Sequence, residues 1–212
     1  MEILSHRGLW LTPEEKNSAG AFLRSFDASF GTETDVRDRN GELVISHDPA
    51  TDAAADTTIT LDHFLTLLGT ASLPLALNIK ADGLADKLHR TMARHPHTHW
   101  FVFDMSIPDM RGHLRVGNPT YARMSEVEQH PAWLDRIAGI WLDGFEGTWY
   151  GTETIRQLLN AGKKVCVVSP ELHRRPPAET WQMLRPLAHE AGLSICTDTP
   201  HEARLFFSES TR

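Results

Sequence analysis

The sequence predicts an α/β protein that forms a single (β/α)8 barrel domain over residues 1–212. Short apolar runs alternate with amphipathic segments along the whole chain, which is typical of βα units. Eight such runs are present, and 212 residues are enough for one compact barrel. We expect the strands at residues 2–5, 31–37, 75–80, 100–104, 120–124, 139–143, 164–169 and 194–197.

Amphipathic segments between the strands predict the helices. Residues 19–26 carry apolar side chains at i, i+3, i+4 and i+7, the spacing of a buried helical stripe, with Asn17 or Ser18 as the N-cap. The same spacing recurs between Thr60, as an N-cap, and Gly69, as a terminator. We expect further helices at residues 84–94, 107–114, 125–136, 178–191 and 200–208, and one between Thr152 and Gly162.

Composition and charge exclude several classes of function. The hydrophobic content of 41% is ordinary for a soluble globular protein, and no apolar run approaches the ~20 residues that span a bilayer. A net charge of -7 gives no electrostatic reason to bind nucleic acid or an anionic membrane. No signal-like region precedes the first strand, so we expect a cytoplasmic location; the oligomeric state is not readable. Cys166 and Cys196 lie in apolar runs, which favours buried thiols over a disulfide or metal pair.

The stretch at residues 30–48 carries the most informative pattern of the chain. Glu33 and Asp35 are two apart in a strand-like run, so both carboxylates leave the same face, about 7 Å apart along the strand. Two acids on one strand face can form a cation site. The alternative interpretation is a solvated acidic hairpin that carries an incidental histidine.

The position of His47 depends on the turn that follows the acidic run. Asn40-Gly41 is a strong hairpin signal. A two-residue turn pairs His47 with Thr34, whereas a three-residue turn that begins at Arg39 and contains a bulge pairs His47 with Glu33. We predict the three-residue turn, because it brings an imidazole beside the two acids.

Other polar residues fall at the carboxyl ends of the predicted strands, where the active site of such a barrel lies. These residues are His6, Arg7, Asn78, Lys80, Asp104, Arg123, Asp143, Glu171 and Asp198. The aromatic residues Trp10, Trp141, Phe145 and Trp149 either belong to the core or form a wall for a sugar or an apolar group. A polar loop at residues 49–58 is of ordinary size for the rim of a site.

Several motifs resemble those of the glycerophosphodiester phosphodiesterase family. They are His6-Arg7-Gly8, Glu33-x-Asp35-Val36, Asn40-Gly41-Glu42-Leu43-Val44 and His47-Asp48. Asn78-Ile79-Lys80 and Thr197-Asp198-x-Pro200 are similar to later strand motifs of the family, so the resemblance covers most of the chain. The related sphingomyelinase D and phosphatidylinositol-specific phospholipase C enzymes are similar in their barrel and their paired histidines. The resemblance therefore implies a barrel of the phospholipase-C-like phosphodiesterase type.

The resemblance also implies a catalytic arrangement. Glu33 and Asp35 are expected to hold one divalent cation, Mg²⁺ or Ca²⁺, because carboxylate oxygens suit those ions. Arg7 and Lys80 are expected to bind the phosphate of the substrate. His6 and His47 are expected to act as general base and general acid, in an order that the sequence leaves open. Trp141 is a further candidate for contact with the substrate.

Two departures from the family pattern affect the expected function. Asn78 stands where the family usually has a third acidic ligand, so Asn78 itself, Asp104, Asp143 or water takes that place. The segment after His47 is shorter than in the family, so the substrate need not be a glycerophosphodiester. We expect a metal-dependent phosphodiesterase acting on a small, soluble phosphodiester. The alternatives are a non-catalytic barrel that binds a sugar phosphate or nucleotide sugar, and a lyase that releases a cyclic phosphate.

Overall fold

The computed structural model describes residues 1–49 and 58–208. Most of the polar loop predicted at residues 49–58 therefore lies outside the described residues. The chain divides into two compact units. One comprises Ser5–Thr120, and the other joins Met1–Leu4 to Tyr121–Arg212. No described helix is both long and apolar enough to cross a bilayer.

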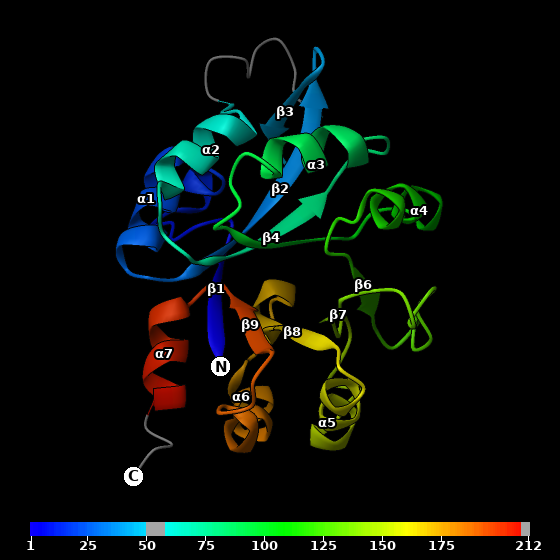
Figure 1. Ribbon diagram of the computed structural model, residues 1–212. Coiled ribbons are helices and arrows are strands. Elements are labelled where there is room, and N and C mark those ends of the chain that lie inside the picture. Colours follow the sequence, from blue (N-terminus) through cyan, green and yellow to red (C-terminus); the bar gives the residue numbers. More distant parts are fainter. Residues whose placement is uncertain (50–57, 209–212) are drawn as a thin grey trace. The chain divides into compact units, whose positions relative to one another are not determined.

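All eight predicted strands are present in the predicted order, and the described residues add a ninth, β3, the return arm of the predicted hairpin. They are β1 (Glu2–His6), β2 (Gly31–Arg39), β3 (Glu42–Ile45), β4 (Pro74–Ile79), β5 (His99–Phe103), β6 (Tyr121–Met124), β7 (Gly139–Leu142), β8 (Lys164–Val168) and β9 (Leu193–Thr197). Their order is β5-β4-β2-β1-β9-β8-β7-β6, and β3 runs back along β2 outside this path (Figure 1). Parallel pairing within each unit and helices between most of the successive parallel strands confirm the predicted (β/α)8 fold class.

The predicted helices are present with one exception. The described helices are α1 (Ala19–Asp27), α2 (Leu61–Leu68), α3 (Ala85–Met92), α4 (Ile107–Val116), α5 (Thr152–Asn160), α6 (Ala178–Leu184) and α7 (Pro200–Ser208). The side chain of Ser18 accepts a hydrogen bond from Ala21 N at the start of α1, and Thr60 accepts one from His63 N at the start of α2. Both caps occupy backbone donors that no helical carbonyl reaches. Gly69 ends α2 with a φ of 61°, as predicted.

The helix predicted at residues 125–136 is wrong. Ser125 and Glu128 exchange backbone hydrogen bonds of 3.3 and 3.1 Å, so the chain turns back directly after β6. Pro131 disfavours helical geometry at the preceding residue and lacks a backbone donor. Trp133 then has a φ of 53°, outside the helical region. Strands β6 and β7 are therefore joined by an irregular segment.

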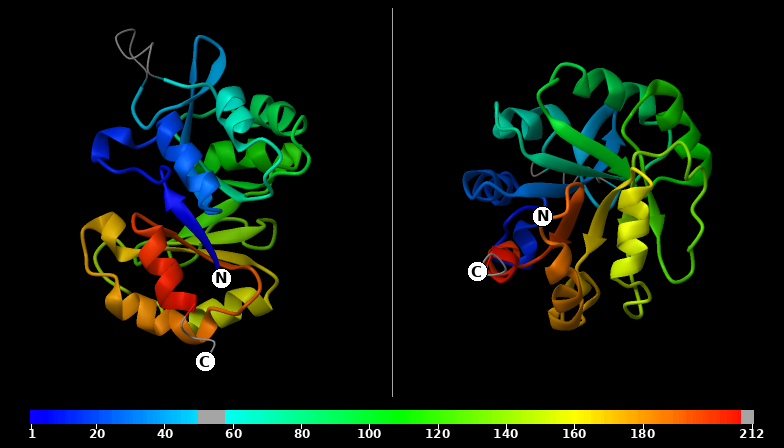
Figure 2. Two further views of the ribbon diagram at one scale, coloured as in Figure 1. Left: turned by 90° about the vertical axis from the view of Figure 1, so that its left-hand side faces the viewer. Right: turned by 60° about the horizontal axis from the view of Figure 1, so that its bottom comes forward.

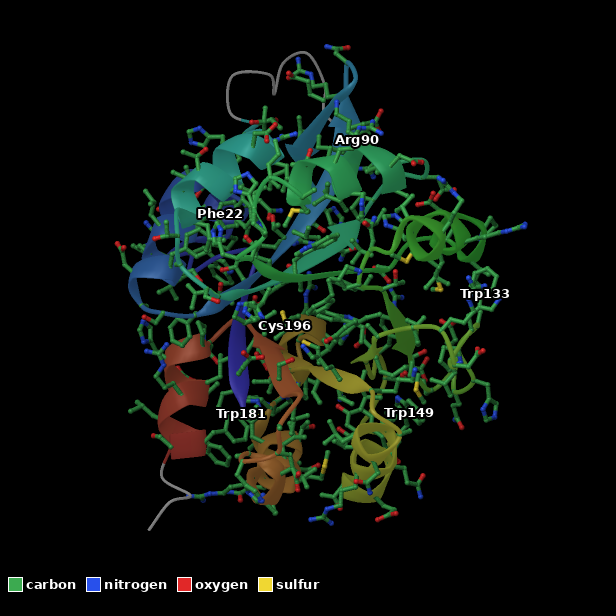
Figure 3. The ribbon with its side chains drawn as sticks, viewed as in Figure 1. Phe22, Arg90, Trp133, Trp149, Trp181 and Cys196 are labelled. Atoms are coloured by element: carbon green, nitrogen blue, oxygen red, sulfur yellow. The ribbon has the colours of Figure 1, made fainter. Side chains whose placement is uncertain are left out.

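Aromatic side chains form the packing between α1 and α2 in the unit of residues 5–120. The ring of Phe22, labelled in Figure 3, lies edge-on to Phe64 with ring centroids 4.6 Å apart, and the ring centroid of Phe26 lies 5.7 Å from that of Phe64. Phe22 and Phe64 are fully buried. Each such pair contributes about 0.5–1.5 kcal/mol beyond the area that it buries. Helix α1 packs against β2, which carries the predicted acids, and α2 packs against β3.

The other unit has its own core around helices α5, α6 and α7. Figure 2 shows α7 beside β9 and α5 beside β8. The ring centroid of Trp181 in α6, labelled in Figure 3, lies 5.6 Å from that of Phe206 and 5.8 Å from that of Phe207, so aromatic rings join α6 to α7. Cys166 and Cys196 are buried thiols, as predicted.

Candidate active site

The β2–β3 hairpin differs from the predicted turn. Arg39 pairs with Glu42, so Asn40 and Gly41 form a two-residue turn, and the predicted three-residue turn with a bulge is wrong. Asn40 and Gly41 have φ values of 49° and 79°. These left-handed conformations suit a type I′ turn, whose twist matches that of the flanking strands.

This register determines where His47 lies. The pairing continues past β3, where Ser46 N donates to Asp35 O at 3.0 Å, so His47 is level with Thr34 rather than with Glu33. Nδ1 of His47 lies 2.9 Å from Oδ1 of Asp48, and 48% of the His47 side chain is exposed. The hairpin therefore directs His47 toward solvent and does not pair it with Glu33.

Glu33 and Asp35 are the buried acids at the centre of the candidate site. They alternate with Thr32, Thr34 and Val36, residue types that favour the half-buried pleat of a strand, and both acids are buried. Asp35 pairs in register with Asn78 of β4. Nδ2 of Asn78 lies 3.4 Å from Oε1 of Glu33, which brings a third polar group to the same place.

Two cations from neighbouring strands compensate these acids. Nε of Arg7 lies 2.9 Å from Oδ2 of Asp35. Nζ of Lys80 lies 3.6 Å from Oδ1 of Asp35 and 3.6 Å from Oδ2 of Asp104. A buried carboxylate without such partners is costly, so these ion pairs offset the burial of Asp35. Arg7 and Lys80 keep 22% and 19% of their side-chain surface exposed, which leaves both within reach of an anion.

His6 stands next to Glu33. Its Nε2 lies 3.9 Å from Oε2 of Glu33, and its carbonyl accepts a 3.1 Å hydrogen bond from Trp10 Nε1. Burial raises the pKa of Glu33, and the charge of Asp35 raises it further, while His6, Arg7 and Lys80 oppose the rise. Burial thus disfavours the charged form of Glu33, and a cation held between the two acids would oppose that effect.

Asn17 is a member of the cluster that the sequence indicated only as a possible helix cap. Its Nδ2 donates to Oδ2 of Asp35 at 2.9 Å, and its Oδ1 accepts from the Thr34 hydroxyl at 2.9 Å. These contacts join residues that are 18 and 17 positions apart. Local spacing gives no signal for such a contact. The only hint is that Asn is among the residues that tolerate the left-handed backbone found at residue 17.

The donor set of this cluster fits a small, hard cation. Oδ1 of Asp35 and Oδ1 of Asn78 are buried and accept no hydrogen bond from any residue that the structure describes. The Asn78 nitrogen donates to Glu33 in this structure, so its oxygen would join the Glu33 carboxylate only if a cation between them replaced that hydrogen bond and the amide made a half-turn. Mg²⁺ is commonly held by one or two carboxylates together with water and substrate phosphate. Within residues 1–49 and 58–208, no three His, Cys, Asp or Glu side chains gather as a metal-binding group, so a cation here would rest on two carboxylates and an amide.

Asp104 belongs to the same unit and follows β5 directly. It has a φ of 70°, and its carboxylate shares Lys80 with Asp35. Asp104 is therefore linked to Asp35 through Lys80. Its role as the third acidic ligand stays a prediction.

Asp143 and Trp141 lie in the other unit, at the end of β7. Oδ1 of the buried Asp143 accepts from Gly144 N at 2.8 Å and lies 2.7 Å from Nε2 of His173. The ring centroid of Phe145 lies 5.0 Å from that of the imidazole, with the two ring planes tilted by 60°. Asp143 thus orients a histidine that the sequence analysis did not single out. Trp141 is buried within β7, which agrees with the core interpretation of this residue.

The structure is similar to solved structures of several proteins. A glycerophosphodiester phosphodiesterase from Agrobacterium tumefaciens superposes with a TM-score of 0.65 at 18% identity, over 99% of this chain and 98% of that chain. A glycerophosphoryl diester phosphodiesterase from Parabacteroides distasonis gives a TM-score of 0.50 at 14% identity, over 98% and 86%. A dihydropteroate synthase from Anaplasma phagocytophilum with bound 6-hydroxymethylpterin-monophosphate gives 0.54 at 9% identity, over 99% and 97%. No protein-family profile and no curated protein sequence matches the chain.

Proposed function

We propose that the protein is a metal-dependent phosphodiesterase that cleaves a small, soluble phosphodiester of the glycerophosphodiester kind. The observation that carries the proposal is the gathering of His6, Arg7, Glu33, Asp35 and Lys80 in one buried, charged cluster. The motif resemblance and the fold shared with two glycerophosphodiester phosphodiesterases point to the same class. Those similarities are low in sequence identity, so the roles below rest on the contacts of this chain.

The cluster supplies groups that recognise a phosphodiester. Arg7 and Lys80 contact the nonbridging oxygens, because guanidinium and ammonium donors form strong charge-assisted hydrogen bonds with phosphate. Glu33, Asp35 and the Asn78 oxygen hold the cation. Mg²⁺ fits this small set better than Ca²⁺, which takes six to eight oxygen ligands. When bound, the cation offsets the negative charge that builds on the phosphate in the transition state.

Proton transfer is assigned to His6 and His47. Glu33 favours the orientation of the His6 imidazole from a distance of 3.9 Å, and an imidazole titrates near neutral pH. His47, hydrogen-bonded to Asp48, is the second proton-transfer candidate and stands half exposed at the base of the hairpin. Positioned proton transfer contributes about 10²- to 10⁴-fold to a rate. Water is the nucleophile in this scheme, unless a substrate hydroxyl next to the phosphate attacks and releases a cyclic phosphate.

A second candidate function is a non-catalytic barrel that binds a sugar phosphate or nucleotide sugar. Asn78 favours it, because an amide oxygen binds a cation more weakly than the carboxylate that the family has at this position. The half-exposed position of His47 points the same way. The presence of His6 beside Glu33 favours the phosphodiesterase function, because that imidazole can transfer a proton.

Turnover of bis(4-nitrophenyl) phosphate separates the two candidates. We expect hydrolysis with Mg²⁺ or Mn²⁺, loss of hydrolysis with chelator, and at least a 10²-fold lower kcat for His6→Gln and for Glu33→Gln. His189→Gln is the matched control, because the His189 side chain is 80% exposed and lies outside the cluster. Absence of metal-dependent turnover, or turnover that neither substitution changes, leaves the binding function.

Phosphorus NMR of the products separates hydrolase from lyase. We expect a phosphomonoester from a hydrolase, and a cyclic phosphate as the final product from a lyase. Glycerophosphodiesters, cyclic phosphates and sugar phosphodiesters form the substrate panel. The glycerophosphodiesters are expected to give the highest kcat/KM.

A further inference from the structure

We infer that Asn17 is a positioning residue that orients the Asp35 carboxylate toward the bound cation and anchors the loop that carries Arg7. The inference rests on the proposed function and deepens it, because it concerns the same cluster. It assigns to Asn17 a part in cation binding that no motif indicated.

The Asn17 amide has one orientation available to it. A carboxylate only accepts hydrogen bonds, so the group that meets Oδ2 of Asp35 at 2.9 Å must be the amide nitrogen of Asn17. The amide oxygen of Asn17 then accepts from the hydroxyl of Thr34 at 2.9 Å. Thr34 and Asp35 are both fully buried. The side chain of Asn17 therefore bridges two successive residues of β2 and fixes the plane of the carboxylate.

The backbone of Asn17 ties the same carboxylate to Arg7. Asn17 N donates to Arg7 O at 3.0 Å, which closes the loop between these two residues. Both residues have left-handed backbones, with φ values of 59° for Arg7 and 62° for Asn17. Nε of Arg7 lies 2.9 Å from the same Oδ2 of Asp35 that Asn17 contacts. Asn17, at the end of the loop, thus connects to Arg7 at its start through the backbone and to the Asp35 carboxylate through its side chain.

The two carboxylate oxygens of Asp35 consequently have different partners. Oδ2 meets Asn17 and Arg7, whereas Oδ1 lies 3.6 Å from Lys80 and accepts no hydrogen bond from the described residues. Oδ1 is therefore the oxygen that a cation can take. The terminal torsion of an aspartate is broad, so removal of the Asn17 amide lets the carboxylate rotate away from this arrangement. Loss of such an orienting partner typically lowers metal affinity or activity about 10- to 100-fold.

Asn17→Gly is the variant that tests this role. Glycine adopts a positive φ without strain, so the substitution removes the side-chain contacts and preserves the turn. Ser29→Gly is the matched control, because Ser29 has a φ of 57° and is exposed in the same unit. We expect the Mn²⁺ dissociation constant, measured by calorimetric titration, to rise about 10-fold or more in Asn17→Gly and to stay unchanged in Ser29→Gly.

A second variant separates positioning from a general loss of stability. Thr34→Val keeps the shape of the side chain and removes the hydroxyl that donates a hydrogen bond to the Asn17 amide oxygen. We expect a smaller rise in the Mn²⁺ dissociation constant for Thr34→Val, and no further rise when it is added to Asn17→Gly. If Asn17→Gly fails to fold, the Mn²⁺ dissociation constant of Thr34→Val alone tests the role of Asn17. An unchanged dissociation constant in Thr34→Val then overturns the inference.

The outcomes distinguish the inference from the proposed function. Equal Mn²⁺ affinities in wild type and Asn17→Gly, with metal-dependent turnover in both, overturn the role of Asn17 and leave the phosphodiesterase intact. Turnover by the wild type without any Mn²⁺ binding also overturns the inference. A wild type that neither binds Mn²⁺ nor cleaves a phosphodiester removes the proposed function, and the role of Asn17 with it.

Discussion

His113 is a fully buried histidine on α4, remote from the charged cluster in the chain but within the same unit. Its Nδ1 lies 3.0 Å from Nδ2 of Asn118, and its Nε2 lies 3.4 Å from Oδ2 of Asp109. Asn118 also meets Nδ1 of His89 through its oxygen, at 3.0 Å. Burial lowers the pKa of His113, and the charge of Asp109 opposes this change only in part. The imidazole is therefore held neutral between α3 and α4.

The stability of the protein is expected to fall with acid because of His113. Its folded-state pKa is below the unfolded value of about 6.5, so the unfolded state binds more protons at acid pH. The stability that neutral His113 contributes is complete above that unfolded value and is lost as the pH falls through the folded value. His113→Leu should weaken this pH dependence. It should also cost about 1–3 kcal/mol at pH 8, because Asn118 loses an acceptor.

Urea unfolding of wild type and His113→Leu at pH 5, 6, 7 and 8 measures this effect. His189→Gln is the control, because its exposed ring should leave the pH profile unchanged. Profiles of wild type and His113→Leu that run parallel over the whole range contradict the assignment to His113.

At the scale of single residues, the sequence predicted the groups that lie on one element and missed those that a loop brings in. Glu33 and Asp35 could be placed on one face because alternation along a strand is strictly local. His6, Arg7 and Lys80 could be placed near them because strand ends meet at one edge of a parallel sheet. Asn17 meets Asp35 only because a loop returns to β2, and no periodicity encodes that return.

The β2–β3 hairpin and the β6–β7 connection show what is decided at the scale of an element. Both candidate turns required Gly41 in a left-handed conformation, so glycine alone did not distinguish them. Asn40 is left-handed as well, which selects the two-residue turn and moves His47 by one position along the strand. In the β6–β7 connection, the apolar spacing favoured a helix, but Pro131 and the turn at Ser125 prevent one.

Substitution of Gly41 in the β2–β3 turn is expected to lower the free energy of unfolding, whereas glycine in place of Asn40 is expected to be tolerated. A Cβ atom added at Gly41 meets nothing within 4 Å, so the cost of Gly41→Ala arises from its φ of 79° alone. We expect a loss of about 1–2 kcal/mol in the free energy of unfolding, measured with urea. Asn40→Gly keeps the left-handed turn available and is the matched control. Equal losses in both variants argue against a conformational origin.

At the scale of the whole molecule, the alternation of strands and helices was enough to predict the order of the barrel. Most of the buried strands are short and apolar, and the helices between strands carry a stripe that must be covered. The division into two compact units did not follow from the sequence. It depends on which helices pack together, as α1 and α2 do through Phe22 and Phe64 in one unit and α6 and α7 do through Trp181 and Phe207 in the other.

Binding of a divalent cation is expected to raise the thermal stability of the molecule. A ligand at 100 times its dissociation constant stabilises the folded state by about 2.7 kcal/mol. For a chain of this size that corresponds to about 5–10 °C in Tm. Calorimetry with and without Mg²⁺ measures the change, and Glu33→Gln should abolish it. Asp86→Asn, an exposed acid that pairs with Arg115 on the surface, should retain it. A rise that survives in Glu33→Gln indicates a cation bound elsewhere.

The first strand also has a consequence for synthesis on the ribosome. Met1–Leu4 belong to the unit whose remaining residues begin at Tyr121, and β1 lies between β2 and β9 in the sheet. Strand β1 is therefore made well before its partner β9, and the edge that faces β9 stays unpaired until β9 follows. Residues 5–120 emerge early enough to collapse first, while the rest must wait for the final helices. The part of the chain that begins at Tyr121 is thus expected to depend more on chaperones during folding than residues 5–120.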